Sequence, residues 1–193
     1  MIPDRAEIYS SIYGAWRLAR LYPSGMRFFS LTIEGFWRSF FAAVIVAPIY
    51  IYIRLIRPTA PVVEGAPPAD PGPGLVVDIG AYVMGWVAFP ALMILLARLL
   101  NVSGQYVSFI VVYNWANVVQ WALFGVVATI AAALGAETGL GVGLNLAALA
   151  AVLFYQWFIA RTALMTSAYV AAGIVVIDTL LGLIINFAAR AVA

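Results

Sequence analysis

The chain contains neither cysteine nor histidine. The lack of cysteine excludes disulfides, thiolate nucleophiles and thiol redox chemistry, and the lack of both residues removes the usual zinc ligand sets. Without histidine there can be no histidine-based acid–base catalysis and no Ser-His-Asp hydrolase. We therefore expect a protein that is not an enzyme and that carries no metal and no cofactor.

Charged side chains are also scarce. Charged residues make up 9% of the 193 residues, whereas soluble proteins have about 25%. Hydrophobic residues make up 65%, against roughly 45–50% in soluble proteins. So few charges cannot cover a surface that faces water, so the solvent of this chain must be largely apolar. The composition predicts an all-α, polytopic transmembrane helical bundle whose main partner is the lipid bilayer, with no nucleic-acid partner.

Five apolar stretches are long enough to cross the roughly 30 Å of hydrocarbon in a bilayer, which takes about 20 helical residues. They form a membrane domain over residues 36–190, in which Pro48 and Pro90 should kink their helices. The predicted spans are about 36–56, 77–99, 106–133, 144–164 and 168–188.

The connections between the spans differ in character. Residues 58–75 hold most of the prolines and predict a semi-rigid exposed loop, after which Asp78 should cap the second span. The short NVSGQ link at 101–105 predicts an antiparallel hairpin between spans two and three. The glycine-rich segment 135–143 lacks the Gly-Lys-Ser/Thr ending of a phosphate-binding loop, so we interpret it as a turn.

Residues 1–35 form a cytoplasmic or interfacial segment in this interpretation. Residues 4–22 predict an amphipathic helix that begins with a capping-box-like pair, Asp4 and Glu7. Such a helix suits the lipid headgroup layer, although it could equally pack on the protein's own cytoplasmic face. Its candidate interfacial residues are Tyr9, Tyr13, Trp16, Arg17 and Arg20.

All ten basic residues are arginine, and their distribution predicts the orientation. Cytoplasmic loops carry the excess of positive charge, and a cytoplasmic N-terminus with five spans places seven arginines inside and three outside. The absence of lysine and the many Ala, Val and Gly residues are typical of a GC-rich bacterial genome. We therefore expect a multi-pass protein of the bacterial inner membrane with a periplasmic C-terminus. The seven are Arg5, Arg17, Arg20, Arg27, Arg38, Arg98 and Arg161, and the three are Arg54, Arg57 and Arg190.

Asp178 lies near the middle of the fifth predicted span. An ionised aspartate at that depth costs roughly 2.5–3.5 kcal/mol on insertion scales, so it needs a partner or a function. It could bind a proton or a cation, pair with Arg161 across spans four and five, or stay neutral and hydrogen-bonded to a neighbour. The pairing with Arg161 is the interpretation that we favour from the sequence.

Asn114, Asn117 and Gln120 recur every three residues along the third span. This spacing places them on one stripe of a helix. The stripe could line a pore, but amides inside membranes more often join helices by hydrogen bonds.

The order of a polar N-terminal segment, five spans and a very short tail is similar to that of the Yip1-like membrane proteins. The hairpin LLARLLNVSGQYVSFIVVYNWANVVQ (95–120) resembles their second and third spans, and WFIARTALMTSAYVAAGIVVIDTLLGLII (157–185) resembles their closing pair. FSLTIEGFWRSF (29–40) stands where eukaryotic members have an Asp-Leu-Trp-Gly-Pro-type motif. In eukaryotes the family serves Rab-linked membrane traffic, a role that does not transfer to a bacterium.

Two functions follow from the sequence. The first is a non-enzymatic scaffold or accessory subunit of a membrane complex, with a membrane-organising role and with helices that pack against other membrane subunits or against a second copy. The alternative is a small oligomeric transporter or channel that uses the intramembrane Asp178.

Overall fold

The computed structural model describes residues 2–56 and 71–192, and throughout these ranges the regular structure is helical. Five helical segments are long and apolar enough to cross a membrane, which confirms the predicted fold class of a multi-pass membrane protein. They are Ile33–Ile56, Val76–Leu99, Ser103–Leu134, Gly139–Ala163 and Ala168–Val192.

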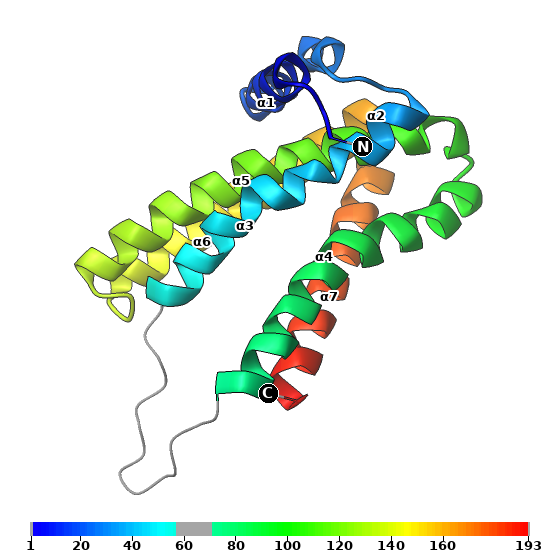
Figure 1. The fold of residues 1–193 in the computed structure, drawn as a ribbon. Helices are drawn as coiled ribbons and strands as arrows, with labels where there is room; N and C mark the ends of the chain where they lie inside the picture. Colours follow the sequence, from blue (N-terminus) through cyan, green and yellow to red (C-terminus); the bar gives the residue numbers. More distant parts are fainter. Residues whose placement is uncertain (1, 57–70, 193) are drawn as a thin grey trace, which may run out of the picture.

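The spans form two arms that meet at one end and diverge toward the other (Figure 1). The first arm consists of α3 (Phe41–Ile56), α5 (Tyr106–Leu134) and α6 (Gly139–Ala163). The second arm consists of α4 (Pro71–Leu99) and α7 (Ala168–Val192). The expected hairpin between spans two and three is therefore only local, because α4 meets α5 near η2 (Ser103–Gln105) and then lies along α7.

The N-terminal segment covers the end where the arms meet (Figure 1). It comprises α1 (Arg5–Ala19), η1 (Pro23–Phe28) and α2 (Ile33–Ser39). Asp4 caps α1 by accepting a hydrogen bond from the Glu7 backbone N–H at 2.6 Å, as predicted. The Glu7 carboxylate does not complete the capping box and instead pairs with Arg38 at 2.7 Å.

The boundaries of three spans differ from the prediction. The first span is interrupted at Phe40, where α2 gives way to α3. Residues 135–138 of the glycine-rich segment form the expected turn, with the Thr138 N–H donating to the Gly135 carbonyl at 3.0 Å. The fourth span begins directly after it at Gly139, because Thr138 accepts a hydrogen bond from the Gly141 N–H at 3.1 Å and so caps a helix that includes the remaining residues 139–143. Apolar length and a good cap outweigh the low helix propensity of glycine here.

The second span also begins earlier than predicted, at Pro71. Residues 71–75 of the expected proline-rich loop are thus helical, and residues 58–70 of that loop lie outside the described ranges. Proline is tolerated in the first turn of a helix, where its missing N–H has no intrahelical partner in any case. Asp78 therefore lies inside α4 and does not cap it. Pro48 and Pro90 lie inside α3 and α4, and α4 bends in the half that contains Pro90 (Figure 1).

Three helices end in the same hydrogen-bonded turn. The residues that follow α1, α4 and α6 adopt left-handed backbone conformations, with φ of 61° at Leu21, 57° at Asn101 and 49° at Met165. In each turn an N–H bonds to the carbonyl five residues earlier, as from Thr166 to Arg161 at 3.3 Å. Glycine is the usual residue at this position, because a Cβ there costs about 1–2 kcal/mol.

We expect Met165→Gly to stabilise the protein by up to about 1 kcal/mol, because it removes this strain and loses little packing. The Met165 residue is 75% exposed. The measurement is thermal unfolding in detergent, with Met165→Ala as the matched control that removes the long side chain but keeps the strained Cβ. A melting temperature for the glycine variant at or below that of the alanine variant would contradict this account.

Candidate functional site

Asp178 lies where three of the spanning helices meet. The Tyr113 hydroxyl of α5 lies 3.0 and 3.1 Å from its two carboxylate oxygens and donates a hydrogen bond to the carboxylate. The Gln156 side-chain amide of α6 donates to Oδ2 at 3.3 Å. Asp178 itself comes from α7, so its carboxylate joins α5, α6 and α7.

The expected ion pair with Arg161 is not formed. Arg161 is exposed and lies over the Trp157 ring, 5.5 Å from its centroid. Height along the two helices does not by itself decide whether the side chains meet. Gln156, which does reach Asp178, is five residues before Arg161, and at about 100° per residue the two side chains leave α6 about 140° apart.

Within the described ranges two ion pairs form, Arg38–Glu7 and Arg54–Asp78. Neither involves Asp178. Its carboxylate therefore has hydrogen-bond donors but no cationic partner from these residues, which corresponds to the third interpretation, an aspartate hydrogen-bonded to its neighbours.

The amide side chains predicted to form one stripe on α5 lie at two different sites. Asn114 is fully buried, and its Nδ2 donates to the Ser39 hydroxyl at 2.9 Å, which ties α5 to α2. Gln120 is 3% exposed, and its Oε1 accepts from Gln156 at 3.4 Å. Positions six residues apart differ by about 120° in direction, so Asn114 joins helices whereas Asn117 and Gln120 line a cavity with Asp178.

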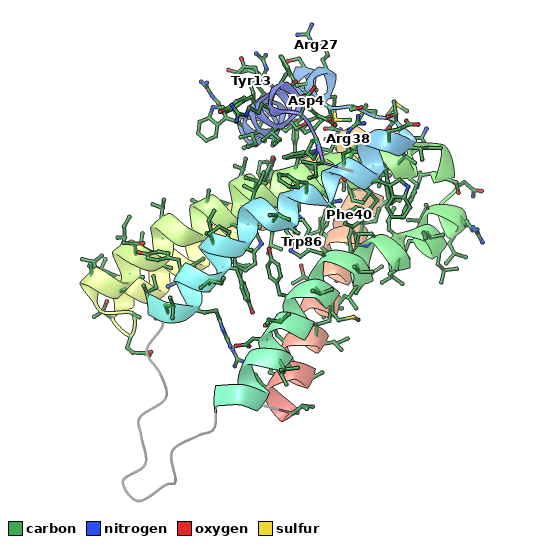
Figure 2. All side chains as sticks on the ribbon, in the orientation of Figure 1. Asp4, Tyr13, Arg27, Arg38, Phe40 and Trp86 are labelled. Carbon is green, nitrogen blue, oxygen red and sulfur yellow. The ribbon has the colours of Figure 1, made fainter. Side chains whose placement is uncertain are left out.

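This cavity, of about 400 Å³, lies between the two arms. Its polar lining includes Asp178, Gln156, Asn117 and Gln120, together with Thr179 and Asn186. The remaining lining is rich in aromatic rings, and Trp86 lies in the fork between the arms (Figure 2).

The rings form a continuous aromatic wall across the arms, made of Trp86, Tyr82, Tyr50, Trp121 and Phe124. The Tyr50 and Tyr82 centroids are 4.7 Å apart and connect α3 to α4, and Tyr50 and Trp121, 5.6 Å apart, connect α3 to α5. Trp86 and Phe124 extend the wall at 6.3 and 6.2 Å from their neighbours. The Tyr82 hydroxyl also donates to the Ala43 carbonyl at 2.6 Å, which fixes the position of this ring against α3.

The cavity is closed toward the end that carries α1. Phe89 and Phe109 are each 2% exposed, and their centroids lie 4.9 and 5.9 Å from that of Tyr113. Since Tyr113 also bonds Asp178, the polar site begins directly behind this aromatic plug.

Toward the opposite end the cavity adjoins a second one, of about 560 Å³. The two share Tyr50, Trp121, Phe124 and Asn186 as lining residues. Arg54 and Glu137, near the free ends of the first arm, also line the second cavity. We call these two adjoining cavities the passage; their lining residues extend from the free ends of the arms to Asp178.

An ion pair that the sequence analysis did not predict joins the arms beside this passage. Arg54 of α3 pairs with Asp78 of α4, and both side chains are partly exposed. The pair was missed because Asp78 was expected to be a helix cap at the edge of a span. Opposite charges at the exit of one span and the start of the next were the signal that could have revealed it.

The predicted interfacial residues lie on α1 at the closed end. Tyr9, Tyr13 and Trp16 are exposed, while Ala15 and Leu18 on the other face are fully buried against the bundle. Arg17 stacks against the rings of Tyr13, Tyr22 and Phe28, and Arg20 lies over Tyr22. The helix thus packs on the protein and still exposes its aromatic face, so its contact with lipid headgroups stays a prediction.

Comparison of the chain with protein-family models, curated proteins and solved structures gave no match. In the described ranges, no group of three or more acidic, cysteine or histidine residues could hold a metal ion. The functional interpretation therefore depends on the geometry of the cavity alone.

We expect the Arg54–Asp78 pair to limit the separation of the arms. Arg54→Gln should broaden the distance distribution between spin labels at Leu55→Cys and Val76→Cys, two exposed positions beside the pair, in a chain that has no native cysteine. An exposed ion pair contributes up to about 1 kcal/mol to stability. We therefore expect the population with separated arms to rise several-fold in Arg54→Gln.

The exchange Arg54→Asp with Asp78→Arg is the matched control and should restore the narrow distribution. The same distribution in wild type and in Arg54→Gln would show that the pair does not hold the arms.

Proposed function

We propose that this protein is a small transport-type membrane protein that reversibly binds a proton or a cation at Asp178. The observation that carries the proposal is a carboxylate that lines a cavity, with hydrogen-bond donors from two helices and no cationic partner among the described residues. Acidic residues inside spans that face a cavity are typical of proton and ion pathways.

The access to Asp178 supports transport more than a fixed structural role. The cavities lead to Asp178 from the free ends of the arms, and the plug of Phe89, Phe109 and Tyr113 closes the other side. A site open to one side and closed to the other is one state of an alternating-access cycle. In such a cycle, movement of α4 and α7 relative to the first arm would change which side reaches the site.

The proposed location is the bacterial inner membrane, with the N-terminus in the cytoplasm and the cavity open to the periplasm. The sorting of arginines supports this orientation. Arg38, Arg98 and Arg161 are in the last turns of α2, α4 and α6, and these helix ends lie at the closed end with α1 and η1 (Figure 1). Arg54 and Arg190 are in the last turns of α3 and α7, which end toward the free ends of the arms (Figure 1). The positive-inside rule then places the closed end in the cytoplasm.

A scaffold or accessory subunit is the second candidate, and the surface of α1 and η1 favours it. Arg17, Arg20 and Arg27 form no ion pair with described residues. Arg17 and Arg20 lie over the exposed ring of Tyr22. Such a surface suits a partner subunit as well as lipid headgroups. The order of a polar N-terminal segment and five spans also resembles the layout of Yip1-like proteins, which fits a membrane-organising role.

Asp178→Asn should abolish reversible protonation inside the membrane domain. Infrared difference spectra of the protein in lipid, recorded between acidic and alkaline pH, should show the C=O band of a protonated carboxylic acid, which Asp178→Asn removes. Asp78→Asn, which alters the paired carboxylate of α4, is the matched control and should keep the band.

Proton or cation flux into liposomes should also fall at least tenfold in Asp178→Asn and remain in Asp78→Asn. The transport proposal fails if Asp178→Asn leaves both the spectrum and the flux unchanged. If flux is absent from the wild type while the tagged protein is isolated from its own membrane with a stoichiometric subunit, the scaffold is the correct function.

A further inference from the structure

We infer that the cavity at Asp178 takes an organic cation, an ammonium or phosphonium ion with apolar substituents. This inference rests on the proposed function and names the class of ligand for the same site. It follows from the charge of the passage, from the aromatic wall and from the way in which the polar side chains of the cavity are already bonded.

The charge of the passage favours a cation. Arg54 is its one basic lining residue among those described, and Asp78 neutralises it. Glu137 and Asp178 line the passage, and neither forms an ion pair with a described residue. Among the described lining residues, an anion would therefore meet two carboxylates without a free positive charge, whereas a cation would meet complementary charge at both.

The aromatic wall favours a cation that carries apolar groups. Cations are attracted to the faces of tryptophan and tyrosine rings within about 6 Å, and quaternary ammonium ions are commonly recognised in this way. Tyr50, Tyr82, Trp86, Tyr113 and Trp121 all line the cavity that contains Asp178. A volume of about 400 Å³ is within the range of sites for small organic ligands and is far larger than a bare metal ion requires.

The polar side chains of the cavity offer acceptors to a cation. Three lining side chains donate to carbonyls of their own helix, namely Asn117 to Tyr113 at 2.9 Å, Thr179 to Val175 at 2.8 Å and Asn186 to Gly182 at 2.8 Å. The oxygens of Asn117 and Asn186 remain available as acceptors, which suits the hydrogens of an ammonium group.

Tetraphenylphosphonium and tetraphenylborate provide a direct test, because the two ions have similar size and shape and opposite charge. Their binding to the full-length protein in lipid nanodiscs would be followed by tryptophan fluorescence and by equilibrium dialysis against empty nanodiscs. We expect saturable binding of the phosphonium and only lipid partition of the borate. Asp178→Asn should weaken phosphonium binding at least tenfold.

Substitutions of aromatic residues distinguish a role of the aromatic wall in ligand binding from a role in folding. Trp121→Leu should weaken phosphonium binding several-fold, Trp121→Phe should retain most of it, and Trp37→Leu, at an exposed position remote from the cavity, should have no effect. Equal uptake of both ions, or phosphonium binding unaffected by both Asp178→Asn and Trp121→Leu, would overturn the inference.

The two proposals can fail separately. If the infrared band of Asp178 titrates but tetraphenylphosphonium does not bind, the organic-cation inference is wrong and the proposed proton or cation binding stands. If Asp178→Asn changes neither the infrared spectrum nor phosphonium binding, both proposals are wrong.

Discussion

A carboxylate in the apolar part of a membrane protein needs compensation, and the arrangement around Asp178 is organised by that need. The Tyr113 hydroxyl and the Gln156 amide bring α5 and α6 to α7 at this one point. The described residues offer the carboxylate hydrogen bonds but no positive charge. Hydrogen bonds alone offset only part of the cost of burying an ion, so the site is suited to acquiring a proton or a cation from outside.

The remaining architecture controls access to this carboxylate. Aromatic rings close the cavity behind Tyr113, and other rings form a wall from α4 through α3 to α5. At the free ends the arms are joined by the Arg54–Asp78 pair, which is partly exposed and therefore weak. In the proposed transport cycle, a firm contact at the closed end and a weak one at the open end would allow the second arm to move relative to the first.

The sequence predicted the class and the number of spans because length and hydropathy determine both. The ends of the spans were less predictable. A capping residue such as Thr138 can start a helix among glycines, and prolines can occupy the first turn of a helix, as they do in α4. Asp178 could be singled out because an isolated charge in a span is conspicuous. Its partners could not, because they depend on the direction in which each helix faces, as the contrast between Gln156 and Arg161 shows. The aromatic wall requires the same three-dimensional information.

The central claim, that water reaches the region of Asp178 from one side of the membrane only, can be measured with single cysteines, because the chain has none of its own. Gly182→Cys places a thiol in the cavity lining, where a Cβ meets no other atom within 4 Å, and Ile184→Cys places one on the exposed apolar surface of the same helix. A charged, membrane-impermeant thiol reagent should modify Gly182→Cys rapidly from one face of sealed vesicles and slowly from the other, and should leave Ile184→Cys unmodified. Equal reaction of Gly182→Cys from both faces, or no reaction from either, would contradict the account.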